Sequence, residues 1–220
     1  MDFDCWPLGD SALLLRFGAL VDAGVNAGVH RAAASLARAD LPGVRSIAPS
    51  YAALVLTLDL PAVARAGGAA ALVERVRASL ATPTEAVHGP ARVVEVPVHY
   101  GGDDGPDLEF VAEATGLGTT EVIRLHSGAD YQVAMLGFRP GFPYLLGLPA
   151  RLRLPRRSSV RARVAAGSVA IAGAQAGIYP SESPGGWHVL GHTGLRLFDP
   201  ARSPPSLLLP GDRVRFVPVS

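Results

Sequence analysis

Lysine is absent from this sequence of 220 residues, in which all 20 basic side chains are arginine. A chain without lysine has no Walker-type phosphate loop, no Schiff base and no lysine general base, because each of these needs an amine side chain. A skewed genomic base composition also produces this arginine usage. The absence therefore excludes the lysine chemistries and assigns no function by itself.

Cysteine is almost absent as well, with Cys5 as the single example. One cysteine excludes an intrachain disulfide and a zinc site built from cysteines. Because Cys5 lies near the start of an apolar segment, we interpret it as a small buried hydrophobe rather than a nucleophile. His188 and His192 have the spacing of a metal pair on a helix, but they flank a predicted strand. We therefore expect no metal site.

Charge is scarce and balanced, with 18% charged residues and a formal net charge of +1. This balance argues against nucleic acid as a main partner. No apolar run approaches the roughly 20 residues that span a bilayer, and the amino-terminal residues lack the basic region of a signal peptide. We expect a cytoplasmic, soluble protein that contacts no membrane. With 49% apolar residues, the chain can bury the cores of one or two domains.

The first third of the chain alternates strand and helix patterns. Strands are predicted at residues 12–17, 44–48 and 52–59, and apolar spacing predicts one helix after the capping Asp22 and another over residues 69–80. The order strand, helix, strand, strand, helix indicates a ferredoxin-like α+β domain over residues 1–85. Residues 81–91 are polar and contain proline, so we place the linker there and the second domain at residues 92–220.

The second domain consists mainly of short strands between glycine and proline corners. The predicted strands begin at Val94 and continue at residues 131–136, 167–172, 187–190, 195–198, 206–209 and 213–219. A short helical insertion interrupts them, with one helix opened by Gly105-Pro106 and a second capped by Thr119 or Thr120. Many short strands with tight corners favour a closed, all-β barrel, because closure removes exposed edges.

Dense sequence blocks follow one another in the second half of the chain. They are Gly-Phe-Arg-Pro-Gly-Phe-Pro-Tyr (137–144), Pro-Arg (155–156), Gly-Ser-Val-Ala-Ile-Ala-Gly (167–173), Gly-Ile-Tyr-Pro (177–180), Ser-Pro-Gly-Gly-Trp (183–187) and Gly-His-Thr (191–193). In this order they resemble the family called allophanate hydrolase subunit 1, which includes the B-type subunit of bacterial 5-oxoprolinase and a sporulation-kinase inhibitor. The resemblance implies that the barrel is cyclophilin-like, without implying prolyl isomerase activity.

The resemblance also implies an activity. The expected activity is that of a heteromeric, ATP-dependent 5-oxoprolinase, which converts 5-oxo-L-proline to L-glutamate with ATP hydrolysis. This chain would be the B-type subunit of that enzyme and would be inactive alone. ATP, with Mg²⁺, would serve the assembled complex, and the partners would be the A- and C-type subunits. Two alternatives remain open: a binding protein that inhibits a sensor histidine kinase, and a subunit of a urea- or allophanate-processing amidohydrolase.

Seven residues are candidates for binding a small amide substrate, and none is assigned as catalytic. Aromatic and polar side chains beside glycine corners predict a cleft bordered by Phe142, Gln175, Tyr179 and Trp187, with Thr193 as a further hydrogen-bonding group. The alternative is that the rings fill the barrel interior and the polar groups form hydrogen bonds with the backbone at its corners.

The other two candidates are His126 and Arg156. His126 either caps a helix or lines the cleft. Arg156 belongs to a segment with six arginines, Pro149 to Arg163, which we predict to dock a partner subunit; the alternatives are a grip on the substrate carboxylate and a solvated loop.

Overall fold

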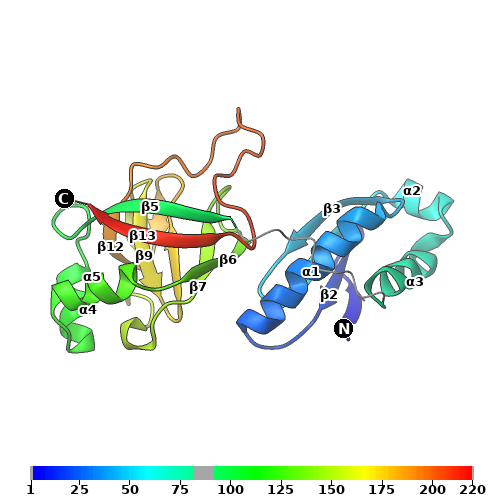
Figure 1. The fold of residues 1–220 in the computed structure, drawn as a ribbon. Coiled ribbons are helices and arrows are strands. Elements are labelled where there is room, and N and C mark those ends of the chain that lie inside the picture. Colours follow the sequence, from blue (N-terminus) through cyan, green and yellow to red (C-terminus); the bar gives the residue numbers. More distant parts are fainter. Residues whose placement is uncertain (1, 82–91, 220) are drawn as a thin grey trace. The chain divides into compact units, whose positions relative to one another are not determined.

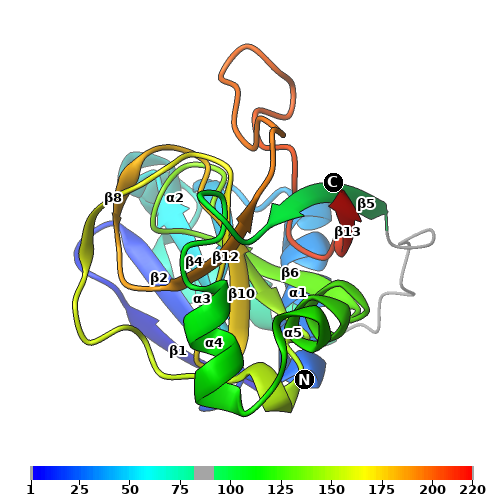
Figure 2. The ribbon, with the colours of Figure 1, turned by 90° about the vertical axis from the view of Figure 1, so that its left-hand side faces the viewer.

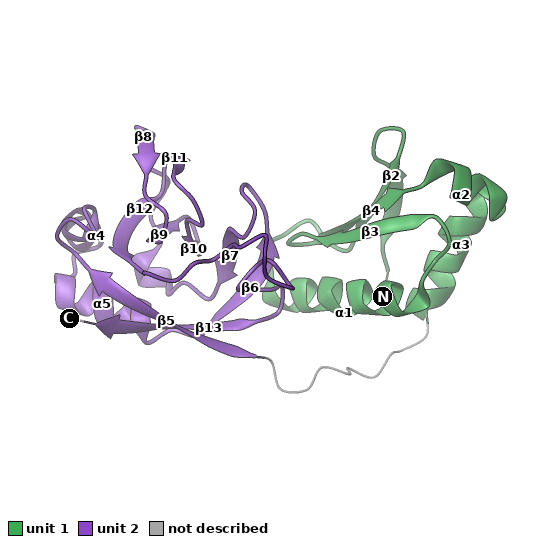
Figure 3. Ribbon diagram, turned by 90° about the horizontal axis from the view of Figure 1, so that it is seen from above, with its two compact units in different colours: residues 1–90 green, residues 91–220 purple. Residues whose placement is uncertain are grey.

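The chain divides into two compact units, residues 1–90 and residues 91–220 (Figure 3). The computed structural model describes residues 2–81 and 92–219. All of the predicted linker except Ala81 lies outside these described residues. Within the described ranges, no helix has both the length and the apolar character that crossing a bilayer requires.

The first unit is an α+β layer. Its elements are β1 (Asp4–Pro7), β2 (Ala12–Arg16), α1 (Ala23–Ala39), β3 (Val44–Pro49), β4 (Ala53–Leu58), α2 (Leu60–Arg65) and α3 (Gly68–Ala81). The strands form an antiparallel sheet in the order β1-β2-β4-β3, and α1 packs against β3, β4 and α3 (Figure 1). Alternate residues of β4, namely Leu54, Leu56 and Leu58, lie on the face of the sheet that packs against the core.

Local signals explain these elements. Asp22 accepts a hydrogen bond from the backbone N–H of Val25, which fixes the start of α1 as the sequence predicts. Strand β1 and helix α2 are missing from the sequence-based prediction. In a ferredoxin-like fold, the edge strand at this position follows the second helix in the chain. Here that edge strand is β1, which comes before β2 at the amino end. The ferredoxin-like assignment therefore stays a prediction.

The second unit is built on a closed barrel of seven strands, which confirms the predicted barrel. Its strands are β5 (Val93–Tyr100), β6 (Tyr131–Leu136), β7 (Pro143–Leu146), β9 (Ser168–Ala172), β10 (Gln175–Ile178), β12 (His188–His192) and β13 (Arg213–Val219). They close in the order β10-β7-β6-β13-β5-β12-β9. Strand β13 runs parallel to β5, and the two lie side by side in Figure 1; the other pairs are antiparallel.

The helical insertion has the predicted position. Helix α4 (Leu108–Thr115) packs on β12, and α5 (Thr119–Ser127) packs on α4 and β13 (Figure 1). Gly116, with φ of 68°, ends α4 as expected. The predicted threonine cap of α5 is wrong, because Gly118 occupies the cap position and no side chain bonds the first turn.

Two predicted strands do not form. Residues 195–198 and 206–209 meet only at a single bridge between Phe198 and Ser206, and the chain between them projects from the barrel (Figures 1 and 2). Prolines 200, 204 and 205 lie in the connecting segment and supply no backbone N–H, which prevents the ladder from extending into that segment.

Conversely, four short strands lie where the sequence suggests corners: β7, β10, β8 (Arg161–Val164) and β11 (Ser183–Gly185). The last two pair as a separate ribbon that projects from the barrel unit (Figure 3).

Gly105 controls how the insertion joins the barrel. A Cβ at Gly105 would lie 2.0 Å from the carbonyl oxygen of Leu190 in β12, so we expect Gly105→Ala to destabilise the barrel unit by about 1–3 kcal/mol. Gly194→Ala is the control, because a Cβ there meets nothing within 4 Å. Urea unfolding followed by the fluorescence of Trp187, in a Trp6→Phe background, measures both. Equal stability of the two variants would contradict this expectation.

Candidate functional site

Four rings form one packed group on the barrel unit, which we call the aromatic cluster: Phe142, Tyr144, Tyr179 and Trp187. The ring of Phe142 is central, with centroid distances of 4.9 Å to Tyr144, 5.2 Å to Tyr179 and 5.6 Å to Trp187. The contacts with Tyr179 and Trp187 are edge to face, which aromatic pairs favour. Gly177 leaves room for Phe142, since a Cβ there would lie 2.9 Å from the ring.

The structure therefore brings three predicted site residues together. Phe142, Tyr179 and Trp187 are all buried, whereas Tyr144 is half-buried and gives the cluster its opening to solvent. The signal that could have added Tyr144 is its position two residues after Phe142 in the same sequence block. Gln175, the first residue of β10, is half-buried and pairs with Ala172 across a tight turn.

The hydroxyl of Tyr179 is fixed by its surroundings. It accepts a hydrogen bond from the backbone N–H of Trp187, and it packs against Gly185, where a Cβ would lie 2.3 Å from the hydroxyl oxygen. Burial raises the pKa of the Tyr179 hydroxyl, as it does for Tyr144. Both tyrosines are accordingly neutral at physiological pH.

Asp107 is the electrostatic centre beside this cluster. Its carboxylate accepts one hydrogen bond from Arg157 at 2.5 Å, two from Arg161 at 2.5 and 2.8 Å, and one from the backbone N–H of Val189 at 2.7 Å. The Asp107 side chain is 3% exposed, and those of Arg157 and Arg161 are 23% and 27% exposed. Burial alone would raise the pKa of Asp107, but the Arg161 and Val189 hydrogen bonds and the two guanidinium charges leave it lowered.

This carboxylate anchors the arginine segment, residues 149–163, to the barrel. Further anchors are the fully buried Leu152, the hydrogen bond between His188 Nε2 and the Pro155 carbonyl, and the one from Arg157 N–H to the Gly186 carbonyl. The segment also holds a 3₁₀ turn (Ala150–Leu152) and the first residues of β8. Docking of a partner here stays a prediction, and a grip on the substrate carboxylate stays its alternative.

The segment's arginines differ in their partners. Arg151 pairs with Glu121, Arg157 and Arg161 pair with Asp107, and Arg163 pairs with Glu182. Among the ion pairs of the described residues, none includes Arg153 or Arg156.

Of the two unpaired arginines, Arg156 is the one with an electrostatic link to the cluster, because its charge acts on the hydroxyls of Tyr144 and Tyr179 against the effect of burial. Its side chain is exposed.

The other two predicted residues lie in different surroundings. His126 is fully buried in the barrel interior, with Nδ1 2.7 Å from the Tyr100 hydroxyl and its ring stacked on Phe216 at 4.6 Å. Burial lowers the pKa of His126 to about 3, so it is neutral at physiological pH. Thr193 is also buried; its hydroxyl accepts from Leu195 N–H at 3.4 Å and its own N–H donates to Gly167, which holds a turn.

Several cavities open on the described surface. One of about 330 Å³ lies beside Arg161, Arg163 and His192, with Asp103 and Asp104 on its rim. A second, of about 390 Å³, runs along residues 136–141.

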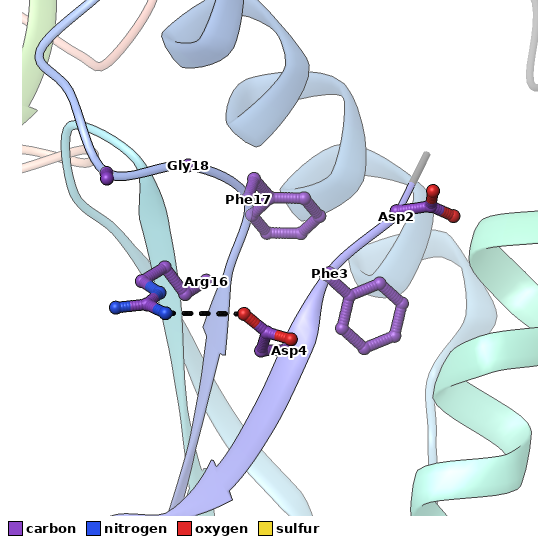
Figure 4. Close-up of a pocket in the computed structure, with 7 residues that line it drawn as sticks. Asp2, Phe3, Asp4, Arg16, Phe17 and Gly18 are labelled. Carbon is purple, nitrogen blue, oxygen red and sulfur yellow. Dashed lines mark hydrogen bonds and ion pairs between the residues drawn. The ribbon is translucent and has the colours of Figure 1, made fainter.

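A third, of about 360 Å³, belongs to the first unit. There Phe3 and Phe17 lie beside an exposed Asp4–Arg16 ion pair at 3.4 Å (Figure 4). In the described ranges, no three His, Cys, Asp or Glu side chains gather as a metal site needs.

Comparison with known proteins identifies the family. The family model for the carboxyltransferase domain, subdomain C and D, matches residues 3–208. The B-type subunit of 5-oxoprolinase from Bacillus subtilis (strain 168) is 44% identical over 97% of this chain and 91% of its own length, and that from Escherichia coli O157:H7 is 43% identical over 97% and 95%. The chain belongs to this family. The resemblance noted in the sequence blocks is thereby confirmed.

Solved structures support the same fold. A structure of TTHA0988 is 42% identical with a TM-score of 0.83, over 95% of this chain but only 40% of its own. The uncharacterised protein PH0987 from Pyrococcus horikoshii is 40% identical with a TM-score of 0.58, over 99% and 98% of the two chains. The urea amidolyase of K. lactis shares the fold at 21% identity, with a TM-score of 0.77 over 99% of this chain and 15% of its own.

The Asp107 carboxylate makes a pH-dependent contribution to stability. We expect Asp107→Asn to lower the free energy of unfolding by about 3 kcal/mol at pH 7, because two guanidinium groups lose a buried charged partner. The pKa is lowered in the folded state, so this stability is fully present above the ordinary aspartate pKa of about 3.9 and is lost as pH falls below it. The difference between wild type and Asp107→Asn should therefore shrink between pH 4 and the acid limit of about pH 2.

Urea unfolding at several pH values, followed by Trp187 fluorescence, measures this difference. The control is Glu182→Gln, which removes an exposed ion pair with Arg163 and should change nothing measurable. An Asp107→Asn protein as stable as wild type at pH 7 would show that the carboxylate is not a structural centre.

Proposed function

We propose that this chain is the B-type subunit of a heteromeric, ATP-dependent 5-oxoprolinase that converts 5-oxo-L-proline to L-glutamate. The observation that carries the proposal is the 44% and 43% identity, across 97% of this chain, to two proteins named as B-type subunits of 5-oxoprolinase. The similarity spans both units, so it is not confined to a widespread module. Use of ATP by the complex is consistent with a cytoplasmic location, which we propose as well.

The chemistry of this chain suits a component that binds rather than one that hydrolyses ATP by itself. Opening the lactam is coupled to ATP hydrolysis, and activation of the lactam oxygen by phosphorylation creates charge that preorganised donors must stabilise. Without lysine, this chain offers arginine side chains and backbone N–H groups as donors. A partner subunit would then provide the nucleotide site, with ATP and Mg²⁺ as components of the assembled complex.

The chain lengths of two proteins with the same fold favour association of this chain with another subunit. The same fold makes up nearly all of PH0987 but only 40% of the TTHA0988 chain, so it occurs both alone and joined to a longer polypeptide. A domain that is covalently joined in one protein is a natural candidate for association with a separate subunit in another. We therefore propose A- and C-type subunits as the partners of this chain.

The fold descriptions of the two units and the two alternative functions are secondary to this proposal. We retain the cyclophilin-like description of the barrel and the ferredoxin-like description of the first unit. The urea amidolyase shares the fold alone, which gives no ground for a urea-derived substrate. Regulation of a histidine kinase stays a prediction.

The proposal predicts that activity depends on assembly. The purified chain should show no 5-oxo-L-proline-dependent ATP hydrolysis, and the chain co-expressed with A- and C-type subunits should show turnover that requires both 5-oxo-L-proline and ATP. Glutamate release and phosphate release, measured together, follow the coupled reaction. The control is the same assembly without this chain. Turnover by the isolated chain, or an assembly that is complete and inactive, would contradict the proposal.

A further inference from the structure

We propose that Arg156 binds the carboxylate of the small amide substrate while the aromatic cluster supports the face of its ring. The identity of that substrate, 5-oxo-L-proline, rests on the proposed function. The recognition chemistry, a carboxylate next to a small ring, rests on the charge of Arg156, the anchored backbone on both sides of it, and the aromatic cluster. The proposal makes Arg156 the residue that distinguishes an acidic lactam from a neutral one.

The charge balance around the cluster favours Arg156 for this role. In the described part of the arginine segment, four of six guanidinium groups already have a carboxylate partner, and Arg153 and Arg156 do not. Of these two, Arg156 is the one whose neighbours are bonded on either side of Trp187: the Pro155 carbonyl accepts from His188 Nε2, and Arg157 N–H donates to the Gly186 carbonyl. Its charge also acts on the Tyr144 and Tyr179 hydroxyls against the effect of burial. Since those tyrosines remain neutral, no anion of the cluster competes with an incoming carboxylate for Arg156.

The backbone on both sides of Arg156 is fixed. The Pro155 carbonyl accepts a hydrogen bond from His188 Nε2 at 2.9 Å, and Arg157 N–H donates to the Gly186 carbonyl at 2.9 Å. The Arg157 side chain is in turn held by Asp107. A cation whose neighbours are already ordered loses less conformational freedom on binding, so this arrangement favours affinity.

The cluster offers an apolar surface at the half-buried Tyr144 and the exposed Phe138. Tyr144 is half-buried, and its ring meets that of Trp187 at a centroid distance of 5.9 Å. Phe138 lies beside the cluster, 59% exposed, with edge-to-face contacts to Phe142 at 5.6 Å and Tyr179 at 6.5 Å. Its φ of 63° is unusual for an aromatic residue, and such strain is retained mainly where it serves a site. The CH₂ groups of a five-membered lactam give its ring an apolar face to place against these rings.

Binding to the full-length chain tests the proposal directly. In a Trp6→Phe background, Trp187 is the single tryptophan, and its emission reports on the cluster. We expect 5-oxo-L-proline to change this emission saturably, and 2-pyrrolidinone, the same ring without the carboxylate, to bind at least tenfold more weakly. Arg156→Ala should remove this preference, and Arg156→Lys should keep part of it. Arg153→Ala, an exposed unpaired arginine of the same segment, is the control and should bind as wild type.

The assembled enzyme provides the second readout. There Arg156→Ala should raise KM for 5-oxo-L-proline at least tenfold while kcat falls by less than about threefold, because ground-state and transition-state binding of the carboxylate are lost equally. An unchanged KM, equal binding of the two lactams, or no emission change with either lactam would overturn the role of Arg156. If the wild-type assembly fails to turn over 5-oxo-L-proline but the fluorescence preference depends on Arg156, the proposed function falls and the carboxylate site stands.

Discussion

The barrel unit depends on one buried carboxylate, that of Asp107, which joins three parts of the chain that are distant in sequence. Its donors are Arg157, Arg161 and the backbone of Val189, which lie 50, 54 and 82 residues further along the chain. Through them the start of α4, the arginine segment and β12 share one fixed point. A buried ion pair is weak grounds for high stability, because desolvation offsets attraction. Its value here is geometric, since it sets where the neighbouring Arg156 lies.

A second constraint comes from the two faces of β9. Val169 and Ile171 point into the barrel interior, whereas Ala170 and Ala172 lie under the aromatic cluster. The strand is therefore buried on both sides, with small residues where large rings must approach. Tyr179 and Trp187 are part of a packed core as well as of the candidate site. Their loss would combine a stability defect with a binding defect, which is why Arg156, an exposed residue, is the cleaner probe.

The sequence predicts the elements whose signals are local. The Asp22 cap, the apolar spacing of α1 and the nearly continuous apolar run of β4 are all readable, and the many short strands correctly indicate a barrel. Strands 195–198 and 206–209 fail because their hydrophobic runs predict a paired ladder, whereas the two segments meet at a single bridge. Asp107 is recognisable as a residue at the start of a helix, but its arginine partners lie beyond the reach of any local pattern. Within the run of six arginines, the Pro155-Arg156 block that resembles the family singles out Arg156, whereas no local pattern separates its surroundings from those of Arg153.

The central claim is that the Asp107 anchor places Arg156 beside the aromatic cluster to receive the carboxylate of an acidic lactam. The most direct measurement is a crystal structure of the assembled complex with 5-oxo-L-proline bound at a concentration near KM. The account predicts the substrate carboxylate within hydrogen-bonding distance of the Arg156 guanidinium and the ring against Tyr144 and Phe138. Substrate bound on another face of the barrel, with Arg156 exposed to solvent or engaged by a partner subunit, would contradict it.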